Sequence, residues 1–348
     1  MVLGRGTFAW VLVDEDNVLD DDDSDPVTLY GIGRVGKATR AHSVQLQPAG
    51  EGVEVLKSAV HAGGNMEVTG TITANGGPVS SNATLTVGLG STVNGDVEAT
   101  TIANAGTITG SQTTLSTPKD MPPANVFDTY LARATPINWI DIDFGGGKLQ
   151  GKMLSHTRNP YGAPNPDGVY FVDVPSKAEF RIEGCRLEGT FVIRLDEKSS
   201  VRLKAGNICE PHRPDYPLMI IKAISLLDAE VELDCYNVLN EGAWSTNFNP
   251  PDWPYKGVSN STTTDLHESK VRGLIHVIRD PFDPAATYVG GSNLMDVCVV
   301  ADGYVLVKST PIIRVPSSLY ISPPDGYSAG SKMIPTPGTW RWAGLPIP

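Results

Sequence analysis

The sequence of 348 residues is poor in positive charge and in long apolar runs. Lys and Arg number 27 against 39 Asp and Glu, for a formal net charge of −12. This balance excludes a nucleic-acid binder, which needs a basic face to neutralise phosphates. No apolar run reaches the roughly 18 residues of a membrane-spanning helix, and the opening residues lack the features of a signal peptide.

Cysteine and catalytic signatures are also scarce. The four cysteines (Cys185, Cys209, Cys235 and Cys298) form no CxxC pair, so the spacing of a zinc site is missing. Their apolar surroundings favour buried thiols, with one or two disulfides as the alternative. No GxSxG, HExxH or P-loop sequence occurs, and we therefore assign no catalytic residue and expect no enzyme.

Glycine (36) and proline (27) are plentiful, and they punctuate the chain every few residues. This excludes a helical bundle and favours many short strands. A region of different composition, residues 63–115, has no aromatic residue, Lys or Arg. It repeats one branched apolar residue flanked by Thr or Ser, followed by Gly or Asn. The inward-facing series is Val68, Ile72, Val79, Leu85, Val87, Val93, Val97, Ile102 and Ile108.

Tight turns between such short strands are typical of a solenoid whose coils stack their apolar residues. We therefore predict an all-β chain folded as a parallel β-helix with a few short helices; the alternative is a β-sandwich or jelly roll. Helices are expected at 52–62 and around 126–133. The expected divisions are 1–62 (strands, acidic loop and helix), 63–115 (repeats), 116–136 (Pro-rich connection) and 137–348 (main β-helix with a C-terminal cap).

An acidic cluster near the N-terminus is the candidate Ca²⁺ loop, and Ca²⁺ is the one cofactor for which the sequence offers ligands. Its members are Asp14, Asp16, Asp20, Asp21, Asp22, Asp23 and Asp25. An EF-hand starting at Asp14 fails because Val18 and Leu19 occupy required positions. A solvated hairpin tip is the other interpretation. The GxGxxG string at 31–36 lacks the helix that a dinucleotide site needs, and it is interpreted as a turn or bulge.

Candidate carbohydrate contacts come from two places. Asp141 and Asp143 in WIDIDF would share one face of a strand, at a separation that suits a glycosidase pair, or would be ordinary strand residues. Trp244, Trp253 and Tyr255 lie in the loop 241–264, where aromatic rings stack on sugars or cover the core. His212 and His276 have no partner close in sequence and are interpreted as structural.

Several strings together resemble one family. GIGRVGKATRAHSVQLQPAGEGVEVLKSAVHAGGNMEVTG, NPYGAPNPDGVYFVDV, FRIEGCRLEGTFVIRL, NFNPPDWPYKGVSNS, KVRGLIHV and PGTWRW are similar to PilX-like, type IV pilin-related envelope proteins of planctomycetes, over roughly residues 5–343. The resemblance implies a cell-surface or periplasmic protein whose full-length form is anchored by an N-terminal helix absent from this chain. It supplies no functional residues. The style of the 63–115 repeats is also similar to that of bactofilins, which are polymer-forming β-helical proteins.

We therefore expect a non-enzymatic, extracytoplasmic solenoid used for surface assembly, with self-association or other envelope and pilus proteins as partners. The PGTWRW tail (Trp340 and Trp342) and the N-terminal strands are the expected caps or contact surfaces. The alternatives are a carbohydrate-binding or carbohydrate-cleaving β-helix and a Ca²⁺-dependent adhesin.

Overall fold

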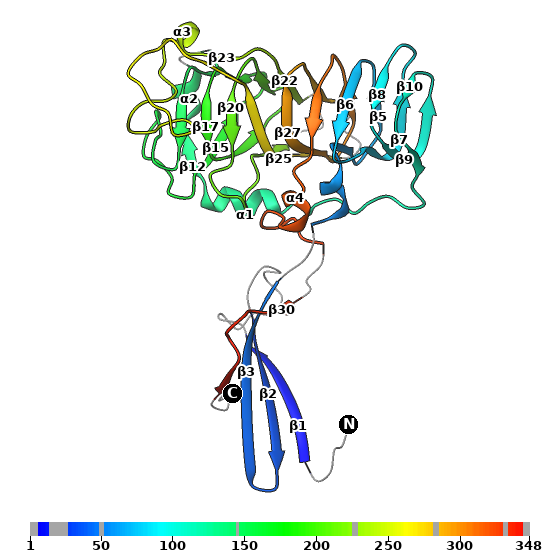
Figure 1. Cartoon of the computed structure of the whole chain (residues 1–348), viewed down its shortest axis with the longest axis vertical. Coiled ribbons are helices and arrows are strands. Elements are labelled where there is room, and N and C mark those ends of the chain that lie inside the picture. The colour runs from blue at the N-terminus through cyan, green and yellow to red at the C-terminus, as the bar shows by residue number, and fades with distance from the viewer. Residues whose placement is uncertain are drawn as a thin grey trace.

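The computed structural model describes residues 6–13, 27–48, 52–143, 146–224, 229–280, 285–329 and 333–343. It consists of a solenoid and a small antiparallel sheet that stands away from it (Figure 1). The solenoid is an all-β parallel β-helix, as predicted, and its strands pair in three parallel ladders that form three faces. The sandwich alternative is excluded because its strands would pair mainly antiparallel.

The first face runs in spatial order through β12 (Thr135–Ile137), β15 (Val169–Val174), β18 (Thr190–Leu195), β21 (Met219–Ala223), β25 (Lys270–Ile278), β27 (Leu294–Ala301), β4 (Val60–Ala62), β7 (Val79–Val87), β9 (Val97–Asn104) and β11 (Gln112–Thr114). The second contains β13 (Lys148–Gln150), β16 (Glu179–Glu183), β19 (Ser200–Lys204), β22 (Glu230–Cys235), β26 (Thr287–Gly291), β28 (Val305–Val307), β5 (Met66–Val68) and the second halves of β7 and β9. The third contains β14 (Met153–Ser155), β17 (Arg186–Glu188), β20 (Ile208–Glu210), the starts of β25 and β27, β29 (Ile312–Arg314), β6 (Thr71–Asn75), β8 (Thr92–Asn94) and β10 (Thr107–Ile108).

The order of the coils in space differs from their order in the chain. The coil that begins at β4 lies in the middle, and the chain first builds outward from it through β11. The chain between β11 and β12 then runs back along the solenoid to its opposite end. The coils from β12 onward are added from that end toward the middle. The last coil, β27 to β29, pairs with the first, so Val299 lies opposite Val60 and Ile312 opposite Thr73. This seam appears in Figure 1 where orange strands meet blue ones.

The repeats fold as their pattern predicts. Val68, Ile72, Val79, Leu85, Val87, Val93 and Val97 are buried inside the solenoid, and Ile102 and Ile108 are partly buried at its end. Parallel register stacks Met66 on Leu85, and Leu85 on Ile102. Gly76 turns one corner with φ of +82°, a conformation that glycine adopts without penalty.

Helices are few and short. α1 (Val126–Arg133) coincides with the predicted helix and packs across the first face. The helix expected at 52–62 is instead a 3₁₀ turn, η1 (Glu54–Lys57), followed by β4, because Val55, Leu56 and Val60 all enter the core. The remaining elements near the solenoid are α2 (Trp139–Asp143), β23 (Leu239–Asn240), α3 (Glu241–Trp244), β24 (Leu266–His267) and α4 (Ser318–Ile321). No helix among the described residues is long and apolar enough to span a bilayer.

Both ends of the chain build the second unit, the terminal sheet. Its strands are β1 (Gly6–Val13), β2 (Val27–Val35), β3 (Ala38–Pro48), β30 (Met333–Pro335) and β31 (Arg341–Ala343). The solenoid, from residue 52 to 329, is therefore an insertion between β3 and β30. The expected divisions at 62 and 137 differ from this arrangement: residues 52–62 belong to the solenoid, and 63–115 and 137–315 form one continuous stack.

Candidate functional site

The terminal sheet gathers aromatic side chains on one face. In its register, Trp10 lies opposite Gly31, Gly31 opposite His42, and His42 opposite Trp342. Residues directly opposite in an antiparallel pair share a face, so this row sets Trp10 on one side of a glycine and His42 and Trp342 on the other. The neighbouring rows add Phe8, Leu12, Leu29 and Val44 to the same face. We call these residues, with Trp10 and Trp342, the aromatic face.

The rings of this face are open to solvent. Phe8 is 72% exposed, Trp10 64% and Trp342 69%. Trp342 stacks on His42, with ring centroids 4.0 Å apart. Exposed apolar patches on soluble proteins mark contact sites, because covering them removes apolar surface from water.

The edge of the same sheet is also open. Within the described ranges β1 pairs only with β2, so one side of this eight-residue strand carries unpaired N–H and C=O groups. An exposed apolar edge strand is a template for adding another strand. The GxGxxG string forms part of β2 and ends at the β2–β3 turn, where Gly36 has φ of +61°, so the interpretation as a turn is confirmed.

The structure describes only one of two further sets of predicted site residues. The acidic cluster from Asp14 to Asp25 lies outside the described residues. The strand predicted for WIDIDF is wrong: the segment is helix α2, which caps the end of the solenoid. Ile142 is buried beneath the helix and Asp141 is exposed on it. Asp141 and Asp143 are therefore not paired on one face of a strand.

The loop aromatics cover the solenoid instead of projecting from it. Trp244 lies over Gly184, where an added Cβ would overlap its indole. Trp253 stacks on the Arg186 guanidinium, 4.0 Å from the ring centroid, and Tyr255 lies edge-on to His267. All three rings are half-buried. Of the two interpretations left open by the sequence, the geometry matches the covering one.

Arg186 holds this loop down. It is 6% exposed and points outward from β17. Its guanidinium donates to the carbonyl oxygens of Phe248 and Trp253 at 2.7 Å and of Pro254 at 3.2 Å. Burial lowers the pKa of Arg186. Charge-assisted bonds of this kind are about twice as strong as neutral ones, so Arg186 is the main polar anchor of the loop.

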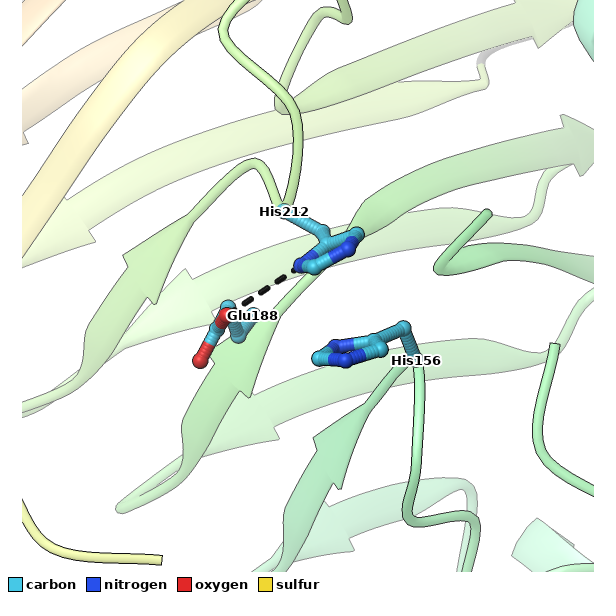
Figure 2. Close-up of side chains that lie close together, drawn as sticks. All are labelled: His156, Glu188 and His212. Atoms are coloured by element: carbon cyan, nitrogen blue, oxygen red, sulfur yellow. Dashed lines mark hydrogen bonds and ion pairs between the residues drawn. The ribbon is translucent and has the colours of Figure 1, made fainter. Parts of the chain in front are cut away.

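Two histidines interpreted as isolated have partners in space. His276 bonds Tyr327 at 3.1 Å and Asp302 at 3.3 Å, and it is completely buried. His212 lies beside Glu188 and His156, with its Nδ1 3.2 Å from Glu188 Oε1 (Figure 2). The ligand atoms of these three residues lie within 4.8 Å of one another. The sequence alone gave no sign of this cluster because its members are 32 and 24 residues apart, which is one coil in each case.

A second cluster, Glu241, Asp265 and His267, is already saturated by hydrogen bonds. Glu241 is completely buried and accepts from the backbone N–H of Phe248 and of Asp265, and it bonds His267 Nε2. Asp265 accepts from the amide groups of Asn249 and Asn260. This network fixes the fold of the loop and leaves little capacity for a metal ion.

The four cysteines are free and buried, as the sequence favoured. Burial raises the pKa of Cys185 and of Cys235 to about 12, so both are protonated at neutral pH. A protonated, buried thiol is a poor nucleophile.

A hollow of about 650 Å³ lies at the end of the solenoid. Its lining includes Trp139, Phe171, Asp173, Arg194, Asp196 and Ile224. Arg194 pairs with Asp173 on the neighbouring coil, at 2.8 Å from Nε to Oδ1. The hollow therefore combines aromatic surface with carboxylates.

No family model and no curated protein matches the chain. It is similar to several solved structures, among them two ice-binding proteins and a pilin. An ice-binding protein from an Antarctic biological consortium has 12% identity and a TM-score of 0.34, over 76% of this chain and 91% of that one. The competence-associated pilin ComZ from Thermus thermophilus has 10% identity and a TM-score of 0.28, over 97% of this chain and 84% of that one. An ice-binding protein from the Antarctic ascomycete Antarctomyces psychrotrophicus has 12% identity and a TM-score of 0.26, over 76% of this chain and 97% of that one. Likenesses this weak leave the function to be inferred from the chain's own geometry.

Proposed function

We propose that this chain is a non-enzymatic, pilin-like protein of the cell surface or periplasm. In this proposal the terminal sheet makes the assembly contacts and the solenoid is the part presented to the surroundings. The partners are further copies of the chain or other envelope and pilus proteins. One observation carries the proposal: the aromatic face is exposed on a small sheet that both ends of the chain build and that stands away from the solenoid.

The physical argument rests on the position of the exposed apolar residues. Phe8, Trp10 and Trp342 gain little from folding where they are, because most of each side chain remains in water. Packing against a partner would remove each ring from water, which is worth roughly 25 cal/mol per Å² of apolar area. The open edge of β1 adds a way to fix the orientation of that partner through backbone hydrogen bonds.

The burial of one candidate nucleophile–base pair, His61 and Ser80, supports a non-enzymatic role. His61 and Ser80 are hydrogen-bonded at 2.8 Å, as a nucleophile and its base would be. Both are completely buried, however, and burial lowers the pKa of His61 to about 3. A substrate has no access to this pair, and the imidazole is a weak base.

The test measures oligomeric state against concentration by size-exclusion chromatography with light scattering, in Ca²⁺ and in EDTA. We expect reversible association that the double variant Phe8→Ser/Trp10→Ser weakens by more than tenfold. The matched control is Leu89→Ser, which changes an apolar residue that is 92% exposed on the solenoid. A strictly monomeric wild type, or equal association in both variants, would contradict the proposal. Dependence on Ca²⁺ would implicate the acidic cluster.

Carbohydrate binding is the second candidate function, and the hollow beside Trp139 favours it. Aromatic surface with flanking carboxylates suits stacking on a sugar ring and bonding to its hydroxyl groups. The test is a glycan array followed by titration of any hit. We expect Trp139→Ala to abolish binding and Ile140→Ser, on the exposed side of α2, to leave it unchanged. Asp196→Asn is a milder second variant, and binding that survives both changes would refute this role.

A further inference from the structure

Three successive coils bring His156, Glu188 and His212 to one edge of the third face. Parallel register sets Ser155 opposite Glu188 and Glu188 opposite Glu210. His156 follows β14 directly, and His212 follows β20 by two residues. Neighbouring strands are about 4.8 Å apart, so side chains at matching positions on adjacent coils can meet at a single point.

The side chains converge as Figure 2 shows. The imidazoles of His156 and His212 are stacked, with centroids 3.6 Å apart and planes 18° from parallel, and the Glu188 carboxylate lies beside both. Because a metal ion lies in the plane of each imidazole that binds it, one of the two rings has to turn out of the stack when both bind one ion. The 3.2 Å between His212 Nδ1 and Glu188 Oε1 matches the ~3.3 Å that separates two ligands of a tetrahedral ion with bonds near 2.0–2.1 Å. His156 Nδ1 is buried and has no hydrogen-bond partner.

That orphaned nitrogen is the second observation that points to a ligand. A buried polar atom without a partner is unfavourable, and such atoms in folded proteins are almost always satisfied. The neighbouring groups leave it unsatisfied, because Glu188 is engaged by His212 Nδ1 and by Trp253 Nε1 at 3.2 Å. The indole thus fixes the carboxylate in the way that outer-shell donors orient metal ligands.

The charged groups near the cluster are committed elsewhere. Arg186 is held by three carbonyl oxygens and by the Trp253 ring, Arg158 pairs with Asp252, and Lys270 pairs with Glu210. None of these cations forms an ion pair with Glu188 among the described residues. Arg186 acts on Glu188 electrostatically but forms no ion pair with it, so the carboxylate can still balance the charge of an ion bound between the imidazoles.

We propose that His156, Glu188 and His212 form a binding site for one divalent transition-metal ion of the Zn²⁺ type. Two imidazoles and one carboxylate suit such ions, whereas Ca²⁺ prefers six to eight oxygen ligands. The ion ties three consecutive coils together and has a coordination position open to solvent. A hollow of about 200 Å³, lined by His212, Tyr216 and Arg272 among others, borders the site at His212.

The experiment uses the full chain, freed of any affinity tag and stripped of metal with EDTA. Zn²⁺ is titrated calorimetrically, and Co²⁺ serves as a spectroscopic probe of tetrahedral nitrogen and oxygen ligation. We expect one equivalent to bind, a higher melting temperature with Zn²⁺, and no competition from millimolar Ca²⁺. His156→Gln, Glu188→Gln and His212→Gln should each weaken binding by more than tenfold and remove the shift in melting temperature.

The matched control is His42→Gln, which changes an exposed histidine in the terminal sheet. Circular dichroism of the metal-free variants shows whether each still folds, so that a folding defect is not mistaken for a lost ligand. Absence of stoichiometric Zn²⁺ binding to the wild type would overturn the proposal. Binding that persists in the folded double variant His156→Gln/His212→Gln would place the ion elsewhere and overturn it equally.

Discussion

At the scale of single residues, the fit between loop and solenoid depends on Gly184. This residue has φ of +59°, and Trp244 lies against the position that a Cβ would occupy. A non-glycine residue in this conformation costs roughly 1–2 kcal/mol, and forcing the indole to move adds a similar amount.

We therefore expect Gly184→Ala to lower the free energy of unfolding by about 3 kcal/mol in urea denaturation. Gly257→Ala is the control. Gly257 lies in the loop 241–264 that covers the solenoid and has φ of +75°, with no neighbour near its Cβ position. It should cost only about 1 kcal/mol. Equal losses would mean that the indole moves without cost.

His61 makes the free energy of unfolding depend on pH. Burial lowers its pKa to about 3 in the folded chain, against about 6.5 in the unfolded one. The unfolded state therefore binds more protons between these values, and the stability contributed by neutral His61 is lost as pH falls from about 6.5 to 3.

Each pH unit in that window costs up to about 1.4 kcal/mol from this residue alone. We expect His61→Gln to flatten the plot of unfolding free energy against pH between 6 and 4, relative to wild type. Parallel plots for His61→Gln and wild type would show that His61 is not the residue that titrates.

At the scale of elements, the loop over the third face is held by Arg186 together with the buried network around Glu241. Removing the guanidinium leaves three carbonyl acceptors without their donor. Unsatisfied buried groups of this kind cost more than the bonds themselves contribute.

We expect Arg186→Ala to release the loop and to accelerate limited proteolysis within residues 241–264 by more than tenfold, with a loss of roughly 3 kcal/mol in stability. Arg194→Ala, which breaks an exposed pair with Asp173 on the same set of coils, is the control. An unchanged cleavage rate in Arg186→Ala would mean that the apolar contacts of Phe248 hold the loop by themselves.

The strands and helices also show which parts of the fold could be predicted from the sequence. The single apolar residue of each short strand predicted the stacks of Val68, Val87 and Ile72, because one side of every strand must face the core. WIDIDF was misassigned because its alternation fits a strand, yet the segment caps an end of the solenoid, where no further coil exists to pair with it.

The cluster of His156, Glu188 and His212 could not be predicted from the sequence, for a different reason. Whether His156, Glu188 and His212 meet depends on coil lengths of 32 and 24 residues, and these are set by loops whose size no local pattern encodes. One residue of the aromatic face, Trp342, belongs to the tail that was expected to be a cap or a contact surface. The register that places Trp342 beside His42 requires pairing between the two ends of the chain.

At the scale of the whole molecule, the solenoid is closed by contacts between residues that are far apart in sequence. The seam joins residues 60–75 to residues 299–314 through three pairs of strands. Gly70 lies at this seam, where an added Cβ would overlap the backbone of Ser309. The seam is thus an internal interface.

We expect two separate polypeptides, residues 52–117 and 118–329, to assemble when they are expressed together without the terminal strands. Gly70→Val should abolish their copurification, because its side chain clashes only with the other fragment. Gly88→Ala, whose Cβ would meet Val68 O at 3.3 Å and Ser91 Oγ at 3.4 Å within its own fragment, should not. Failure of the unmodified fragments to associate would show that the seam is too weak without a continuous chain.

The seam also has a consequence for synthesis on the ribosome. The coils from residue 60 to 115 emerge early, but the strands that cover β4, β5 and β6 are made about 240 residues later. At roughly 5–20 residues per second this leaves an open parallel edge for on the order of 10–50 s. Residues 60–115 contain no Phe, Trp or Tyr and are rich in Thr, Asn and Gly. This composition makes them a poor nucleus for aggregation before the covering strands are synthesised. The composition that first distinguished this segment therefore suits a nascent chain whose first coils fold long before their neighbours exist.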